Sequence, residues 1–427
     1  MQPIILINAP VTKVSPHSKL AIPLGLAYIA SVLIQAGRRV KVIDFNISGL
    51  NLRRVDNIVN NKPAIVGISA HTETYPNALK IAKRIKERDS SIPIIIGGPH
   101  ASILPIEVLE DGAIDYVAIG EGEATMTELA DYLIDGKGQL KDIDGIGYKD
   151  EQGQIQINKR RELLNPDDIP FPSRDLFPLD FYEEKWNIST ARGGCPYQCP
   201  FCSASFIWEG HRRPRSPENI IEEIRMVFEE RGATYIFFSE DIFTLNKKWV
   251  YKLLELIKQL DYTVEWGCAT RVDLVDEQLI MDMADAGCRA IQFGVESGSQ
   301  RILDAVKGIT KEQVLKVIKA CKKADIDVAS SFMVPFPQDT KETIRETKEF
   351  IKELFDAGSK IYMSYTSPYP GTKFYLEKEE LGIKILTDKW DEFDAKHNII
   401  ETKHLTSKEI EELVDEIVDY TGLRKRV

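Results

Sequence analysis

The chain has 427 residues, of which 43% are hydrophobic and 28% charged, and its net charge is −11. This length predicts two or three domains, and the acidic balance argues against a general nucleic-acid binder, because phosphate binding needs clustered Lys and Arg. The start MQPIILINAP lacks the basic flank of a signal peptide, and no run of about 18 apolar residues predicts a membrane span. We therefore expect a cytoplasmic protein that binds neither membrane nor nucleic acid, although HRRPR at residues 211–215 is a candidate basic patch.

The first 140 residues alternate short apolar runs with amphipathic stretches. The apolar runs are typical of buried strands, and the stretches between them have helical periodicity. We expect strands at residues 3–9, 39–45, 64–69, 92–98 and 115–123, and helices at 24–37, 77–88 and 124–135. This order predicts a doubly wound, Rossmann-like α/β domain over residues 1–140, whose ligand binds beyond the carboxyl ends of the parallel strands.

Residues 141–186 break the alternation, and we interpret them as a connector. The stretch GIGYKDEQGQIQIN predicts a small hairpin. The Pro- and Asp-rich stretch after it predicts ordered chain without regular elements, because proline fixes φ and removes a donor.

From residue 187 the alternation of strands and helices returns. Strands are expected at 187–193, 234–240, 264–271, 290–297, 327–335 and 360–370, and helices at about 217–231, 247–260, 276–286, 311–324 and 340–357. Six such units predict a partial (β/α)6 barrel over 187–375, with active-site residues at the carboxyl ends of the strands. Residues 376–427 are expected to form a charged, helical C-terminal region.

Three of the six cysteines lie close together in the stretch GGCPYQCPFCSAS, as Cys195, Cys199 and Cys202. A zinc site usually shows paired CxxC knuckles with four ligands, and no second pair follows. An iron–sulfur cluster held by three thiolates leaves one iron open for another ligand. The spacing favours such a cluster, and Gly193 and Gly194 are expected to let the backbone approach its inorganic core.

The motif CxxxCxΦC, with Phe201 before the third cysteine, resembles the signature of the radical S-adenosylmethionine (SAM) enzymes. It follows the first strand of the expected barrel, as in that family. The resemblance implies a [4Fe–4S] cluster whose open iron binds SAM, with Phe201 beside the adenine. It also implies SAM contacts at later strand ends. Ser239, Glu240 and Asp241 lie where the family holds the amino group of SAM, Arg271 could pair with its carboxylate, and Glu296 would contact the ribose hydroxyls.

One segment departs from the pattern of that family. Where relatives read roughly FMIGLPGET, this chain has FMVPFPQDT at residues 332–340. Pro335 and Gln338 stand in place of glycines, which closes backbone positions and leaves the SAM contacts of this strand open.

A doubly wound domain in front of a radical SAM barrel resembles the cobalamin-dependent branch of the family. The segments that carry this resemblance are residues 66–78, 95–102 and 119–125, and the DxHxxG loop of other cobalamin proteins is absent. The resemblance implies base-off cobalamin near nine residues: Ser69, His71, Thr72, Gly97, Gly98, His100, Gly120, Glu121 and Gly122. His71 either ligates cobalt or caps a turn, and His100 is a candidate contact to the corrin edge. A degraded domain that binds no cofactor is the alternative.

Both cofactors together imply a C-methyltransferase acting on an unactivated carbon. Cobalamin would take a methyl group from one SAM, and a second SAM at the cluster would yield the 5′-deoxyadenosyl radical that activates the substrate. The expected substrate is a peptide or protein residue, for example a glutamine Cα, or a small natural product, and the expected electron donor is of the flavodoxin or ferredoxin type. Trp208, Tyr365 and Tyr369 are candidates to line the substrate site.

Two other functions remain open, namely a cyclase or rearrangement enzyme with the same cofactors and a non-catalytic iron–sulfur module. A methylthiotransferase acting on RNA would need three more cysteines, yet residues 1–194 contain none. Cys288 and Cys321 are predicted to be buried apolar residues, whereas the direction of Cys268 is open.

Overall fold

In the computed structural model, which describes residues 2–12 and 20–421, the chain folds as two units. The first unit comprises residues 1–185 and 389–391, and the second comprises residues 186–388 and 392–427. The segment 141–186, expected to be a connector, therefore packs almost entirely with the first unit.

Over the described residues, the first unit contains a seven-stranded sheet in the order β2-β1-β3-β4-β5-β6-β7. The strands are β1 (Ile4–Asn8), β2 (Val40–Asp44), β3 (Ile65–Ser69), β4 (Ile94–Gly97), β5 (Tyr116–Ala118), β6 (Ile146–Lys149) and β7 (Ile155–Ile157). The first five in sequence are mutually parallel, as predicted. The predicted hairpin is β6–β7, and it extends the sheet because β6 pairs with β5 in the antiparallel sense.

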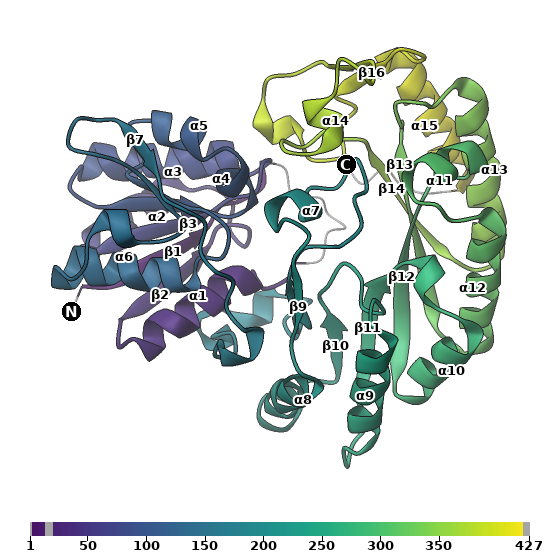
Figure 1. The fold of residues 1–427 in the computed structure, drawn as a ribbon, viewed down its shortest axis with the longest axis horizontal. Coiled ribbons are helices and arrows are strands. Elements are labelled where there is room, and N and C mark those ends of the chain that lie inside the picture. The colour runs from purple at the N-terminus through teal and green to yellow at the C-terminus, as the bar shows by residue number, and fades with distance from the viewer. Residues whose placement is uncertain (1, 13–19, 422–427) are drawn as a thin grey trace. The chain divides into compact units, whose positions relative to one another are not determined.

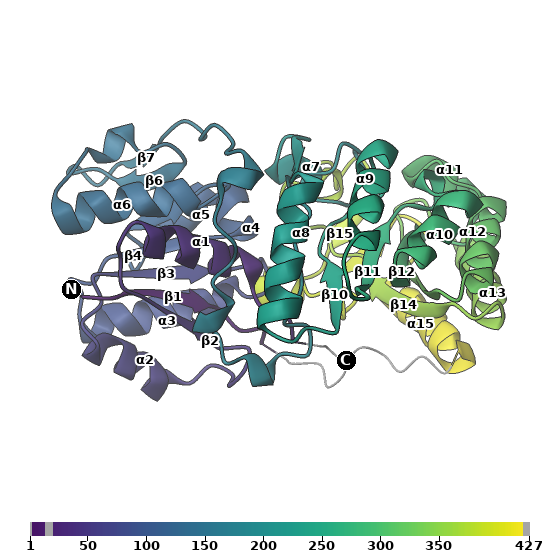
Figure 2. The same cartoon turned by 90° about the horizontal axis from the view of Figure 1, so that it is seen from below.

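Helices cover both faces of this sheet, which explains why its central strands β1, β3 and β4 are almost entirely apolar. They are α1 (Leu24–Gln35), α2 (Leu52–Asn60), α3 (Tyr75–Arg88), α4 (Pro99–Ile103), α5 (Pro105–Glu110) and α6 (Glu123–Asp135). One core lies under α1 and α6 and the other under α2, α3 and α5 (Figure 1 and Figure 2). The sequence analysis did not predict α2, α4 or α5. Helices α4 and α5 are short, and each begins at a proline, which occupies the first helical turn without needing a donor.

The second unit is built on five parallel strands in the order β10-β11-β12-β13-β14, counted over the described chain. They are β10 (Tyr235–Phe238), β11 (Glu265–Thr270), β12 (Cys288–Glu296), β13 (Asp327–Val334) and β14 (Lys360–Tyr365). The strand expected at 187–193 is different. Ile188 makes a single parallel bridge to Phe238, and the chain then forms β8 (Ala191–Gly193), which pairs antiparallel with β9 (Arg212–Pro214). The six-unit barrel is therefore five full strands and one bridging residue.

Helices follow one another along the outside of this curved sheet (Figure 1). They are α8 (Pro217–Arg225), which continues as a π-helical turn at Met226–Glu230, α9 (Lys247–Lys258), α10 (Glu277–Asp285), α11 (Gln300–Val306), α12 (Lys311–Lys323) and α13 (Lys341–Asp356). All but α11 lie where the sequence predicts a helix. The short helices α7 (Ala204–Ile207) and α14 (Lys373–Leu376) flank the barrel mouth.

The prediction of a helical region from residue 376 onward is wrong for its first part. The chain there forms a hairpin of β15 (Ile383–Ile385) and β16 (Ile400–Thr402), and helix α15 (Ser407–Thr421) begins only afterwards. A capping box begins α15, since the Thr406 N–H donates to Glu409 Oε2 at 3.0 Å and the Glu409 N–H donates to Thr406 Oγ1 at 3.4 Å.

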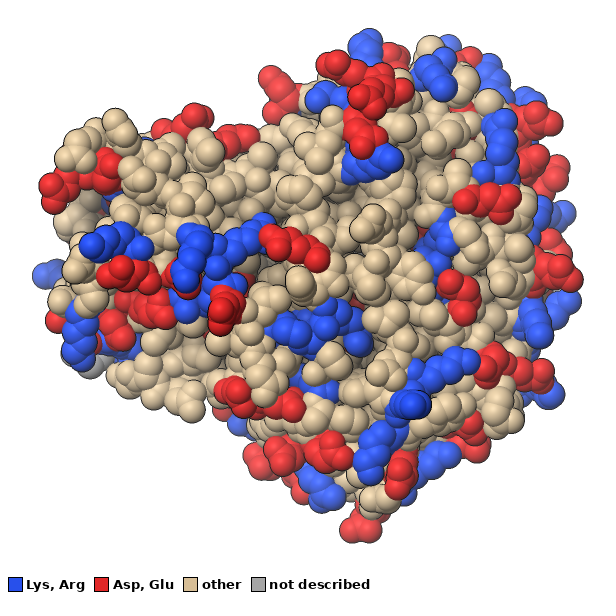
Figure 3. All heavy atoms as spheres, in the orientation of Figure 1, with Lys and Arg blue, Asp and Glu red and all other residues tan. Residues whose placement is uncertain are grey.

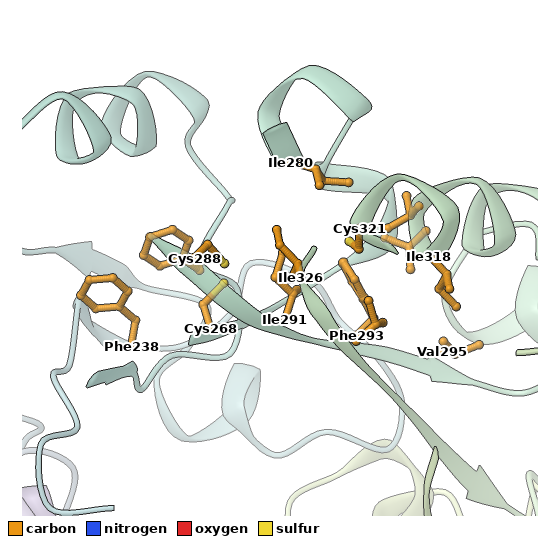
Figure 4. Close-up of a cluster of buried hydrophobic side chains, with 14 of the residues drawn as sticks. Phe238, Cys268, Ile280, Cys288, Ile291, Phe293, Val295, Ile318, Cys321 and Ile326 are labelled. Atoms are coloured by element: carbon orange, nitrogen blue, oxygen red, sulfur yellow. The ribbon is translucent and has the colours of Figure 1, made fainter. Parts of the chain in front are cut away.

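The remaining cysteines belong to the core of the second unit. Cys268, Cys288 and Cys321 have no exposed surface. The sulfur atoms of Cys268 and Cys288 point toward each other among aromatic and aliphatic side chains (Figure 4). The prediction for Cys288 and Cys321 is confirmed, and Cys268 is buried in the same way.

Candidate functional site

The three cysteines of the motif lie on the loop between β8 and α7, hereafter the cysteine loop (residues 194–203). The loop leaves the barrel beyond the carboxyl end of β10, because the Ser239 N–H donates to the Ile188 oxygen and the chain runs outward from there. Cys195, Cys199 and Cys202 are all partly exposed. The motif therefore sits at the end of the barrel where such folds carry their active sites.

The two glycines before the first cysteine are needed for packing. Gly193 has φ +95°, and a Cβ there would collide with the His211 carbonyl oxygen. A Cβ on Gly194 would press against Ala204 and Trp208. The expectation that these glycines face an inorganic core is therefore revised, because they let the cysteine loop lie directly against residues 204–211.

A cavity of about 160 Å³ adjoins the cysteine loop. Its lining combines β8, the cysteine loop, β9 and the segment after β10, namely Ala191, Gly193, Gly194, Cys195, Pro196, Arg212, Ser239, Glu240, Asp241 and Ile242. In the described part of the chain, no three His, Cys, Asp or Glu side chains gather closely enough to hold a single metal ion. The thiols of the cysteine loop suit a cluster, in which each thiolate binds a different iron.

Burial raises the thiol pKa values in this loop. The pKa of Cys202 rises to about 11, mainly through burial and also through the nearby charge of Asp241. Burial likewise raises the pKa of Cys199, whereas the charges of Lys307 and Arg271 act in the opposite direction. Because iron binds the thiolate, loading of a cluster must release these protons.

The segment after β10 presents three polar residues to the cavity. Glu240 already has partners, since its carboxylate accepts from Arg212 Nε and from the Thr190 hydroxyl. The side chains of Ser239 and Asp241 are exposed to solvent. The protein atoms around the carboxyl group of Asp241 still desolvate it in part, which raises its pKa. Ser239 and Asp241 are thus the side chains that remain accessible to a ligand.

The basic run at 211–215 supplies internal ion pairs. Arg212 pairs with Glu240, and Arg215 pairs with Glu223, which has no exposed surface. On the visible face of each unit, basic and acidic side chains are interspersed (Figure 3). The candidate basic patch is therefore a structural element of the barrel.

Arg271, at the end of β11, supports the cysteine loop. Its guanidinium donates to both carboxylate oxygens of Asp273 at 2.9 and 3.0 Å and to the Lys307 carbonyl at 2.9 Å. It also stacks over the ring of Tyr197, 3.9 Å from the centroid. Tyr197 lies between the first two cysteines, so the stacking of Arg271 on its ring supports the cysteine loop. The sequence analysis did not predict this contact.

Glu296 ends β12 in an uncommon conformation. Its φ is +76°, and the pairing register with β13 shifts between Gly294 and Glu296. Glu296 Oε1 accepts from Lys307 Nζ at 2.6 Å, and Nζ also donates to the Gly294 oxygen at 2.5 Å. Lys307 was missed at the sequence level because it follows α11, which was not predicted.

The aromatic residues near the cysteine loop differ in exposure. Phe201 is half-buried, with ring centroids 5.8 Å from Phe336 and 6.3 Å from Phe374. The Phe374 N–H donates to the Pro200 oxygen at 3.1 Å, which fastens α14 to the loop. Tyr365 is buried in the barrel core, and burial raises its pKa to about 12, so it is a core residue and does not line an open site.

In the first unit, the predicted cobalamin residues follow three adjacent strands. The order β2-β1-β3-β4-β5 places the change of winding direction between β1 and β3, where ligands of such sheets bind. Ser69 ends β3, His71 and Thr72 follow it, and Gly120 follows β5 at the same end of the sheet. Gly120 has φ +77° and open space where a Cβ would be, whereas Gly98 is required by its close approach to the Ala70 backbone.

The two histidines of this edge have different environments. His71 is exposed, and desolvation lowers its pKa. His100 has no exposed surface, stacks on Tyr75 at 4.2 Å and meets the edge of Trp390 at 5.3 Å. Burial lowers the pKa of His100 to about 4, and its Nε2 has no hydrogen-bond partner among the described residues. The expected direct contact of His100 with the corrin edge is therefore revised to a buried supporting role.

Comparison with known proteins gives the class of the chain. The profile of the radical SAM superfamily matches residues 192–351, and that of the B12 binding domain matches residues 18–130. The fold is similar to that of the cobalamin-dependent S-adenosylmethionine radical enzyme OxsB, solved with aqua-cobalamin and S-adenosylmethionine bound, with a TM-score of 0.79 at 19% identity over 98% of this chain and 67% of that one.

Two relatives with similar sequences show to which family the chain belongs. The chain is 36% identical to the uncharacterized methyltransferase PH0819 of Pyrococcus horikoshii, over 95% of this chain and 88% of that protein. It is 27% identical to the anaerobic magnesium-protoporphyrin IX monomethyl ester cyclase of Rubrivivax gelatinosus, over 85% and 67%. The chain belongs to the cobalamin-dependent radical SAM methyltransferase family, whose cofactors are a [4Fe–4S] cluster, SAM and cobalamin. Among the described helices, none combines the length and apolar character of a membrane span.

Proposed function

We propose that this protein is a C-methyltransferase that adds a methyl group to an unactivated carbon. Two features support the proposal: a cysteine loop beside a cavity in the radical SAM unit, and a change of winding direction at the carboxyl ends of the parallel strands in the B12-binding unit. When bound, the cluster and SAM supply a radical that removes hydrogen from carbon, and cobalamin supplies the methyl group.

The barrel residues bind and orient. Cys195, Cys199 and Cys202 hold the cluster, and Phe201 borders the adenine of SAM. Ser239 and Asp241, which are accessible in the cavity, accept hydrogen bonds from the amino group of SAM. Glu240 is neutralised by Arg212 and shapes the cavity wall, and Glu296 receives the ribose.

The first unit binds cobalamin at the carboxyl edge of β3, β4 and β5. The exposed ring of His71 is available to the lower face of the cofactor. The open space beside Gly120 leaves room for a bulky ligand next to the backbone. The remaining residues of this edge line the site: Ser69, Thr72, Gly97, Gly98, Glu121 and Gly122.

The proposed substrate is a peptide or protein residue, such as a glutamine Cα, or a small natural product. The proposed electron donor is a flavodoxin or ferredoxin. A cyclisation or rearrangement without methyl transfer is the second candidate, and the 27% identity to a cyclase supports it.

The test is anaerobic reconstitution with iron, sulfide and cobalamin, followed by methyl-labelled SAM and a low-potential reductant. We expect 5′-deoxyadenosine together with S-adenosylhomocysteine, and label on cobalamin. Omission of cobalamin should abolish S-adenosylhomocysteine and leave deoxyadenosine. Formation of deoxyadenosine alone in the complete mixture would favour rearrangement. If neither deoxyadenosine nor S-adenosylhomocysteine forms, the proposal is contradicted.

A further inference from the structure

Lys307 is a buried cation at the mouth of the barrel. Only 8% of its side chain is exposed. Its ammonium group donates to the Gly294 carbonyl at 2.5 Å and to Glu296 Oε1 at 2.6 Å, both at the end of β12. A lysine loses much side-chain freedom when it is buried in this way, so the contact it makes must be worth that cost.

The local backbone is arranged around this contact. Glu296 has φ +76°, a conformation that non-glycine residues rarely adopt outside constrained sites. The register shift between Gly294 and Glu296 is a bulge, which re-aims the side chain at the end of a strand. Any side chain at residue 294 would overlap with Glu296 and Lys307, so the glycine, the bulge and the lysine serve one placement of the carboxylate.

Lys307 is also joined to the cysteine loop. Its carbonyl oxygen accepts from Arg271 Nη2 at 2.9 Å, and the guanidinium of Arg271 stacks on Tyr197, between the first two cysteines. Arg271 therefore connects the pair of Lys307 and Glu296 to the cysteine loop, which is proposed to hold the cluster. The charges of Lys307 and Glu296 also act on the thiol of Cys199, so the pair lies close to the cysteine loop.

The pair leaves one acceptor and one donor unused. Within the described part of the chain, Glu296 Oε2 accepts no hydrogen bond, and Lys307 uses two of its three N–H donors. A carboxylate oxygen accepts from hydroxyls, and an adjacent ammonium donates to a hydroxyl oxygen. An acceptor and a donor side by side are complementary to two neighbouring hydroxyl groups.

We propose that Lys307 is a positioning residue of the SAM site, which fixes Glu296 so that the site selects a ribose carrying both hydroxyl groups. This inference rests on the proposed function. Without Lys307, the half-buried carboxylate of Glu296 would lose its counter-charge and its fixed orientation. The selection between ribose and deoxyribose would then weaken together with the affinity for SAM.

The test compares the reconstituted wild-type enzyme with K307M, K307R and E296Q. Labelled SAM is bound at equilibrium, and adenosine and 2′-deoxyadenosine are used as competitors. We expect K307M to bind SAM about tenfold more weakly and to lose most of the preference for adenosine, the size of effect that one charge-assisted hydrogen bond supports. K307R, which keeps the charge, should retain most of that preference.

Lys323→Met is the matched control, because Lys323 pairs with Glu277 on the exposed surface of the same unit. It should bind SAM as the wild type does. Iron content and thermal unfolding are measured for every variant, so that loss of the fold is seen separately. An intact K307M that keeps both SAM affinity and the adenosine preference would overturn the inference and leave the proposed function standing. A wild-type enzyme that takes up the cluster but binds no SAM would overturn both.

Discussion

At the scale of single residues, Gly193 and Gly210 distinguish two reasons why a position requires glycine, namely a positive φ and a lack of space for a Cβ atom. Both have positive φ, +95° and +72°. A Cβ on Gly193 would collide with the His211 carbonyl, whereas a Cβ on Gly210 would meet nothing within 4 Å. An alanine would therefore have a strained backbone at either position, but only at position 193 would its Cβ atom also clash with residue 211 beside the cysteine loop.

We expect Gly193→Ala to reduce the iron content after reconstitution by more than half and to lower the stability of the second unit. Gly210→Ala should cost only about 1 kcal/mol, the strain of one left-handed residue, and should keep its iron. Iron analysis, the absorbance of the cluster and thermal unfolding measure the difference. Equal iron content in the two variants would show that the close approach of residues 193 and 211 does not matter to the cysteine loop.

At the scale of elements, the strands and long helices were predictable from the sequence, and the departures have local causes. Strands β1, β3 and β4 of the first unit are almost entirely apolar, which a sheet covered on both faces requires. The barrel strands β12 and β13 instead alternate buried with more exposed positions. The expected strand at 187–193 was wrong because only Ile188 pairs with β10, and from Ala191 onward the chain pairs with β9 instead. The capped helices α12 and α13 were predictable, whereas α11 has only seven residues and no side-chain cap.

The same limit applies to the candidate site. The cysteines and strand-end residues follow from a motif and from the order of elements. Arg271 on Tyr197 and Lys307 on Glu296 could not be predicted, because each contact joins segments that are distant in sequence and depends on side-chain direction. Asp241 was visible beside Glu240, but only the pairing of Glu240 with Arg212 shows which carboxylate remains accessible.

Arg215 shows how a buried charge joins elements. It donates to the Ser189 carbonyl at 2.8 Å and to Asn219 Oδ1 at 2.7 Å, and it pairs with Glu223 on α8. We expect Arg215→Met to cost about 3–5 kcal/mol, because it removes the charge of Arg215 from beside the buried carboxylate of Glu223.

The double variant R215M/E223M should recover much of that loss, because it removes both charges. Urea unfolding and hydrogen exchange in α8 and residues 187–190 report the effect. A double variant as unstable as the sum of the two single variants would contradict this account of the pair.

At the scale of the whole molecule, the chain does not divide cleanly in sequence order. Residues 389–391 follow the barrel, yet they belong to the first unit. Trp390 Nε1 donates to Glu107 Oε1 on α5 at 2.9 Å, and its ring meets the edge of His100. The composition and periodicity of residues 376–427 do not predict that residues 389–391 pack with the first unit. A segment of three residues is too short to show a hydrophobic periodicity, so its long-range contacts cannot be inferred from sequence.

The His100 environment therefore depends on a segment encoded almost 300 residues later. We expect Trp390→Ala to expose one side of the buried His100 ring and to lower the local stability of α4 and α5 by about 1–3 kcal/mol, the size of effect that lost aromatic packing and one hydrogen bond support. Hydrogen exchange should rise in residues 99–110 and stay unchanged in the barrel strands. Phe181→Ala is the control, since this aromatic side chain of the same unit is 63% exposed and should change neither. Unchanged exchange in residues 99–110 of Trp390→Ala would mean that α4 and α5 are stable without the returning segment, and that the Tyr75 ring and the Thr72 hydroxyl are enough to hold His100.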